Sequence, residues 1–327
     1  QTPYSLVASQ AIQNTHGISL PAPFISQFTT ASAPPPPPAA GAITVSFPDD
    51  QGNVTVTATQ GTATPDTLTV VINTESGSIT SANVGPDGSF TASLFAQLGD
   101  ELLVVLRDEA GRQTVVSAGA YVHPDGRRII TAGGGTIPVA GGATLTLAPQ
   151  AVTIPTTLRT SVVDPSEFPI ALPPGYRVLP GLKIELDRPL NIAARLSFPL
   201  PQDIALSPNA RPFLARTQVI AGETVLVMVD SMRVLNNEIT TSSPPFEGQR
   251  EGGIYHVVIP GLPIPVLLQG TVTTTLSNGA IQPVAGIVVR VTDNPQVVTT
   301  KKDGSFAIDA YPTNFETKDL TITAIDP

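Results

Sequence analysis

Three side chains of this sequence could act as imidazole acid–base groups near neutral pH: His16, His123 and His256. They lie in three different segments, and no Gly-x-Ser-x-Gly motif presents a nucleophilic serine. Cysteine is absent, which excludes thiolate nucleophiles and cysteine zinc sites. We therefore expect a protein that is not an enzyme, with no catalytic residues and no resident cofactor.

Oxygen-bearing side chains in the first third of the chain are the candidates for a metal site. Carboxylate and amide oxygens suit Ca²⁺, and five of them could converge at one end of the first predicted domain: Asp49, Asp50, Asn53, Asp100 and Asp108. Their spacing does not match an EF-hand loop. The alternative interpretation is that these residues are solvated turn acids.

The charge distribution argues against nucleic acid as a partner. The net charge is −9, and no Lys or Arg occurs before Arg107. The rest of the chain is nearly balanced and has no basic stripe, so the phosphate backbone would meet no matching charge. The longest purely apolar runs of the whole chain are also far too short for a transmembrane segment.

The composition predicts many short strands separated by turns. The chain has 327 residues, which is enough for two or three domains, and 34 of them are proline and 27 are glycine. A helix of normal length has no room between the prolines. There is no tryptophan and the five tyrosines are scattered, so no aromatic platform for sugar stacking is predicted.

Apolar residues recur at every second position, which is the pattern of half-buried strands. In the middle of the chain the pattern involves Leu145 and Leu147, then Leu182, Ile184 and Leu186, then Ala194, Leu196, Phe198 and Leu200. In the first third it involves Val54, Val56 and Ala58, then Leu68, Val70 and Ile72, then Ala92, Leu94 and Ala96, then Leu102, Val104 and Leu106. We predict an all-β fold, a tandem array of three β-sandwich (immunoglobulin-like) domains with an extended N-terminal arm.

The predicted units follow from the turns and prolines. Residues 1–42 form the arm, and its five prolines from Pro34 to Pro38 form a stiff polyproline II linker. The three sandwiches span residues 43–125, 130–262 and 267–327, the last of which could be incomplete.

The first unit resembles a bacterial immunoglobulin-like repeat. The resemblance rests on Gly88-Ser89-Phe90, on Gly99-Asp100-Glu101 and on the segment from Val105 to Arg112. It implies a module of a surface adhesin stalk. Arg112 stands where the family pattern usually has Asn, which weakens a calcium role taken from the family.

The middle unit resembles a ZU5-like sandwich. The resemblance rests on the glycine-rich entry Gly133-Gly134-Gly135, on Pro149-Gln150-Ala151 and on Pro180-Gly181-Leu182. Some relatives of that fold cleave themselves at a His-Phe-Ser sequence. This chain has His256-Val257-Val258 at the corresponding place, with no hydroxyl to attack the peptide bond.

The last unit resembles a carboxypeptidase-regulatory-like, or transthyretin-like, module. The matching segments are Gln269 to Val272, Pro283 to Val289, Thr299 to Phe306 and Leu320 to Ala324. The module stops where its family commonly adds another strand, so one sheet edge is expected to be open.

Three functions remain open at this stage. The chain could be a non-catalytic structural module of a secreted or cell-surface stalk, adhesin or filament, which binds itself or other surface proteins. It could be a filament subunit whose arm, Tyr4 to Ile12 and Ile18 to Phe28, donates a strand to the open sandwich of the next copy. It could also supply the accessory domains of a larger secreted enzyme or glycan-binding protein.

Overall fold

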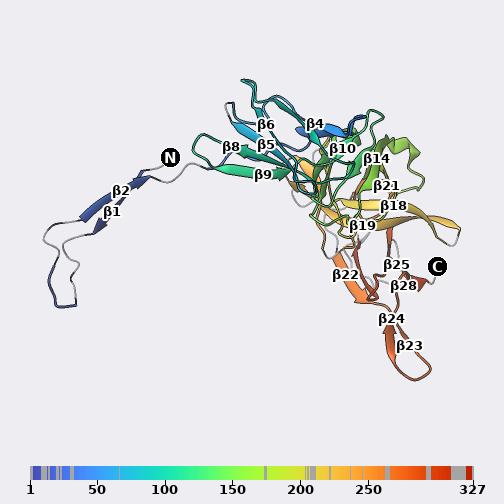
Figure 1. The fold of residues 1–327 in the computed structure, drawn as a ribbon. Helices are drawn as coiled ribbons and strands as arrows, with labels where there is room; N and C mark the ends of the chain where they lie inside the picture. The colour runs from blue at the N-terminus through green and yellow to red at the C-terminus, as the bar shows by residue number, and fades with distance from the viewer. Residues whose placement is uncertain are drawn as a thin grey trace.

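The structure is a computed structural model, shown as a ribbon in Figure 1. It describes residues 3–8, 13, 15–19, 22, 24–29, 33–65, 67–172, 175–202, 204, 206, 211–220, 222–235, 237–244, 246–261, 266–291, 296–310 and 322–325. These residues form strands and turns with no α-helix among them, and the helical elements are two 3₁₀ turns, η1 (Ala140–Gly142) and η2 (Pro165–Glu167). The all-β class is confirmed.

The N-terminal segment folds back on itself. β1 (Pro3–Ala8) and β2 (Phe24–Thr29) pair antiparallel in a two-stranded sheet of their own. Figure 1 shows this hairpin apart from the other strands. Within the described residues, the segments that were predicted to donate a strand therefore pair with each other.

Two sheets enclose the first core. One contains β3 (Ile43–Ser46), β4 (Asn53–Ala58) and β7 (Phe90–Phe95), and the other contains β6 (Ile79–Asn83), β5 (Leu68–Asn73), β8 (Leu102–Arg107) and β9 (Gln113–Ser117). Strands β4, β7 and β8 bury the apolar residues that the period-two pattern predicted. Valines, alanines and leucines from both sheets meet in this core.

The polyproline run packs against this unit. Pro35 is buried, and Thr114 of β9 donates its hydroxyl proton to the carbonyl oxygen of Pro35. Because proline has no N–H group, the run can lie along a strand edge without offering donors to a further strand. The predicted linker is thus anchored to the body at Pro35.

The prediction of which β5 residues face inward was wrong by one position. The inward face was expected to hold Leu68, Val70 and Ile72, whereas the structure buries Thr69, Val71 and Asn73 and leaves Leu68 exposed. The reason lies in the turn after the strand, where Asn73 donates to Asp100 at 2.7 Å and accepts the N–H of Glu75 at 3.0 Å. A shift of one residue reverses both faces of a strand, so this polar side chain sets which residues face inward.

The second core lies between two larger layers. One contains β10 (Tyr121–Val122), β11 (Arg128–Ile130), β14 (Thr156–Val163), β15 (Arg177–Val178), β16 (Gly181–Leu186), β18 (Phe213–Ile220) and β21 (Gly253–Ile259). The other contains β12 (Gly135–Pro138), β13 (Thr144–Leu147), β17 (Arg195–Pro199) and β20 (Glu238–Thr241). The long strand β19 (Glu223–Leu235) pairs first with β18 and then with β20, and so joins the two layers.

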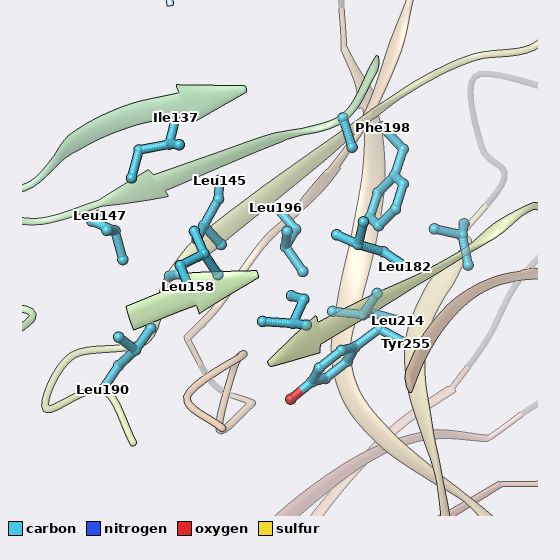
Figure 2. Close-up of a cluster of buried hydrophobic side chains, with 14 of the residues drawn as sticks. Ile137, Leu145, Leu147, Leu158, Leu182, Leu190, Leu196, Phe198, Leu214 and Tyr255 are labelled. Atoms are coloured by element: carbon cyan, nitrogen blue, oxygen red, sulfur yellow. The ribbon is translucent and has the colours of Figure 1, made fainter. Parts of the chain in front are cut away.

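Figure 2 shows the side chains that fill this core. Leu145, Leu182, Leu196 and Tyr255 are each at most 1% exposed. They come from four different strands in both layers. The alternation predicted for the middle of the chain is confirmed at these leucines.

The last strands form a smaller unit. It contains β25 (Val288–Val291), β26 (Gln296–Thr299) and β28 (Ile322–Ile325) in one sheet, the pair β22 (Val266–Thr271) and β27 (Ser305–Ala310), and the hairpin of β23 (Thr273–Thr275) and β24 (Ile281–Pro283). Figure 1 shows the β23–β24 hairpin projecting from the body.

Two turns with the same sequence have the same structure. In each of Asp87-Gly88-Ser89 and Asp303-Gly304-Ser305, the aspartate accepts the N–H and the hydroxyl proton of the serine. Each glycine has a positive φ, and a Cβ there would lie 2.5 Å from a carbonyl oxygen. Both turns therefore require glycine.

Candidate functional site

The structure keeps the three histidines in unrelated surroundings. His16 lies in the exposed N-terminal turn beside Thr15. His123 lies in the turn after β10, with its Nδ1 atom 2.8 Å from a carboxylate oxygen of Asp125. His256 is 1% exposed on β21, its ring packs edge-on against Phe168 at 4.8 Å, and burial lowers its pKa to about 4. A buried neutral imidazole of this kind is a packing residue.

The five calcium candidates do not converge. Asp100 precedes β8 and Asp108 follows it, and the six residues of this strand span about 20 Å at roughly 3.3 Å per residue. Among the described residues, no group of three or more Asp, Glu or His side chains comes together to hold a metal ion.

Most of these side chains already have turn partners. Asp49 accepts the N–H of Asn53 at 2.8 Å, while Asp50 is exposed in the same turn. Asp108 binds the guanidinium of Arg112 at 2.8 Å, and this contact lowers the pKa of the carboxyl group. Arg112, which departs from the family pattern, thus neutralises one of the proposed ligands.

Paired strands join the cores of this chain to one another. At the first junction, β10 pairs in parallel with β3 and antiparallel with β11, which in turn pairs with β14. Tyr121 and Ile129 face the first core, whereas Ile130 faces the second. Main-chain hydrogen bonds and side-chain packing therefore both connect the first core to the second.

The second junction is built in the same way. β26 pairs in parallel with β19, with Leu226 opposite Gln296 and Val227 opposite Val297. In one shared apolar cluster, Phe213 and Val258 from the middle strands pack with Val289 and other residues of the last unit. The segment between β21 and β22 is thus not the sole connection between these units.

Buried polar groups lie at this second junction. Gln296 of β26 is fully buried and donates its amide to the carbonyl oxygen of Asp309 at 2.6 Å. Burial raises the pKa of the Asp309 carboxyl group, and a hydrogen bond with Ser231 of β19 opposes that rise. A carboxyl group from the last unit is therefore buried against the long strand of the middle unit.

Asp230 is the neighbouring buried acid. It is 0% exposed on β19 and accepts the hydroxyl proton of Ser243 at 2.5 Å and the N–H of Ser242 at 3.3 Å. Burial raises its pKa to about 6 despite these hydrogen bonds. Its partners hold the loop after β20 against β19, which is a structural role.

The sequence prediction overlooked these junction residues. The available signal was an acid within an apolar run, because Asp230 directly follows Val225 to Val229. Asp309 carried a similar signal, because Phe306, Ala307, Ile308 and Ala310 flank it, whereas Gln296 carried none, since Asp293 and Asn294 lie within three positions of it.

Comparisons with known proteins place the chain in no family. No protein-family model matches it and no curated protein matches it. In the described residues no helix is long and apolar enough to cross a membrane.

Two solved structures show a remote similarity. One is a Ca²⁺-stabilized adhesin that helps an Antarctic bacterium reach out and bind ice, 13% identical over 88% of this chain and 98% of that chain, with a TM-score of 0.17. The other is a tetra-tandem repeat in the extending region of a large adhesion protein, 14% identical over 88% of this chain and 74% of that chain, with a TM-score of 0.16. Such TM-scores do not define a shared fold.

Proposed function

We propose that the chain is a stiff, non-catalytic structural segment of a secreted or cell-surface protein, built from three β-sandwich units in a row. The observation that supports this function is the main-chain pairing across both junctions, at β3–β10–β11 and at β19–β26. A single linker would let neighbouring units rotate, whereas a shared ladder with shared core residues resists rotation. The role is that of a stalk, adhesin or filament element that transmits force or sets a distance.

Hydrogen exchange tests this proposal at the amides of the junction. If the units form one stiff body, peptides covering β10 and β26 exchange as slowly as those covering the buried strands β8 and β13. Peptides covering the exposed strand β24 are the fast-exchanging control, because all three of its residues are exposed. Fast exchange in β10 and β26, with protection retained in β8 and β13, would refute the stiff junctions.

Self-assembly by strand addition is a second candidate. It is favoured by the β1–β2 hairpin, which forms a separate two-stranded sheet, and such a sheet gains little stability alone. It is also favoured by β22, which among the described residues pairs only with β27 and leaves Val266 and Leu267 about half exposed. The arm of one copy would then complete the sheet of another copy.

Deletion of residues 1–33 tests assembly without removing Pro35. Light scattering is expected to show large species for the intact chain and monomers for the deletion. A strictly monomeric intact chain at high concentration would contradict assembly while leaving the stiff-segment proposal in place. The third function, as accessory domains of a larger secreted enzyme or glycan-binding protein, would require a catalytic or binding domain elsewhere on a longer chain.

A further inference from the structure

A cleft of about 430 Å³ lies at the first junction. Most of its wall comes from three segments: the end of the polyproline run (Pro38–Gly41), the end of β9 with the following turn (Val116–Ala120), and the edge strand β12 with its glycine-rich entry. Pockets for small molecules are of this size, and they combine mostly apolar walls with a few polar groups.

Arg128 of β11 is the one charged residue among the described residues that line the cleft. Its strand neighbours show which way it faces. Ile130, two residues along, lies in the second core, and Leu158, directly opposite on β14, is 1% exposed in the same core. Arg128 therefore occupies an inward-facing position at the end of that core, where an apolar residue would be expected.

The guanidinium of Arg128 has no hydrogen-bond or ion-pair partner among the described residues. Burial alone lowers its pKa, with no carboxylate to offset the loss of water. The described part of the lining contains no Asp or Glu, and the adjacent Glu101 packs against Gly133. A half-buried charge without a partner is costly in a folded protein.

We propose that this cleft binds an organic monocarboxylate with a short apolar body, either a free acid or the carboxyl end of a peptide, with Arg128 as its anchor. A guanidinium matches a carboxylate with two parallel hydrogen bonds. The alanine, valine and proline walls match an apolar body. Phosphate fits less well, because a single cation among apolar walls would leave a second negative charge unpaired. The Ser117 hydroxyl in the lining accepts the N–H of Gly119 at 3.3 Å and can still donate a proton to the ligand.

The test uses the intact chain with hexanoate and with acetyl-Ala-Val as probes, monitored by NMR chemical shifts. Hexanamide and the C-terminally amidated peptide are the uncharged counterparts. We expect the carboxylates to shift resonances around residues 116–122 and 128, and the amides and phosphate to bind more weakly. Tighter binding of the peptide would identify a chain terminus as the ligand, and tighter binding of hexanoate would identify a free acid. Equal binding of acids and amides, tighter binding of phosphate, or no binding of either acid would overturn the proposal.

A matched pair of variants separates a binding arginine from a structural one. Arg128→Gln should weaken carboxylate binding about tenfold or more, because a charge-assisted hydrogen bond is lost. It should leave the melting temperature unchanged or raise it, since an unpaired half-buried charge is removed. Arg233→Gln, at an exposed position of β19, is the control and should change neither quantity. A lower melting temperature for Arg128→Gln with unchanged binding would show that the arginine only supports the fold.

Discussion

Asp230 and His256 should make opposite contributions to the pH dependence of stability. Asp230 has a pKa of about 6 in the folded chain against 3.8 as a free side chain, so the folded state binds its proton more tightly. The resulting stabilisation is complete below pH 3.8 and is lost as the pH rises through 6. His256 has a pKa of about 4 against 6.5, so its stabilisation is present above pH 6.5 and is lost as the pH falls through 4.

The two effects oppose each other between pH 7 and pH 5. Linkage gives Asp230 a stabilising contribution of about 1 kcal/mol on going from pH 7 to pH 5, and gives His256 a destabilising contribution of about 2 kcal/mol. Asp309, whose pKa is also raised, acts in the same direction as Asp230. Carboxyl groups with lowered pKa values, such as that of Asp108, matter mainly below this range.

Substitution of either residue should therefore expose the effect of the other. We expect the free energy of unfolding of Asp230→Asn to fall by about 2 kcal/mol from pH 7 to pH 5, and that of His256→Leu to rise by about 1 kcal/mol over the same range. Since both residues lie in the second unit, one unfolding transition reports on both. Urea unfolding followed by far-ultraviolet circular dichroism suits a chain without tryptophan. The reasoning is refuted if both variants keep the pH dependence of the unsubstituted chain.

Three further predictions concern packing, turns and metal. Leu196→Ala should cost about 2–5 kcal/mol in urea unfolding because the side chain is 0% exposed, whereas Val219→Ala, at a position that is 68% exposed, should change stability by less than about 0.5 kcal/mol. Gly304→Ala should destabilise the last unit by about 1–3 kcal/mol in thermal melts, since φ is +74° and the new Cβ would meet the carbonyl oxygen of Val272. The control is Gly279→Ala at an exposed position with φ +80°, which should destabilise the unit less because the new Cβ would enter open space. A chelator should leave the melting temperature unchanged in calorimetry, because the predicted calcium ligands are separated or paired; a drop of several degrees would restore a metal site.

The sequence predicted the strands and turns well because their causes are local. Alternation at Val54 and Val56, or at Leu182 and Ile184, reflects a strand with one buried face. The Asp-Gly-Ser turns could be predicted for the same reason, since the aspartate and the glycine act within three residues. The facing of β5 could not, because it depends on Asn73 reaching Asp100 across 27 positions.

The junctions escaped prediction for a different physical reason. A strand that belongs to one core alternates between apolar and polar residues, but a strand shared by two cores must be apolar on both faces. Ile129 and Ile130 illustrate this, because adjacent residues point into different cores. In sequence such a strand looks like any short apolar run and gives no sign of its two partners. From the sequence alone, Arg128 at the end of that run looks like an ordinary charged residue at a strand boundary. Only the pairing of Arg128 with Leu158 reveals that it faces inward, so the cleft at the junction follows from the fold and from no local motif.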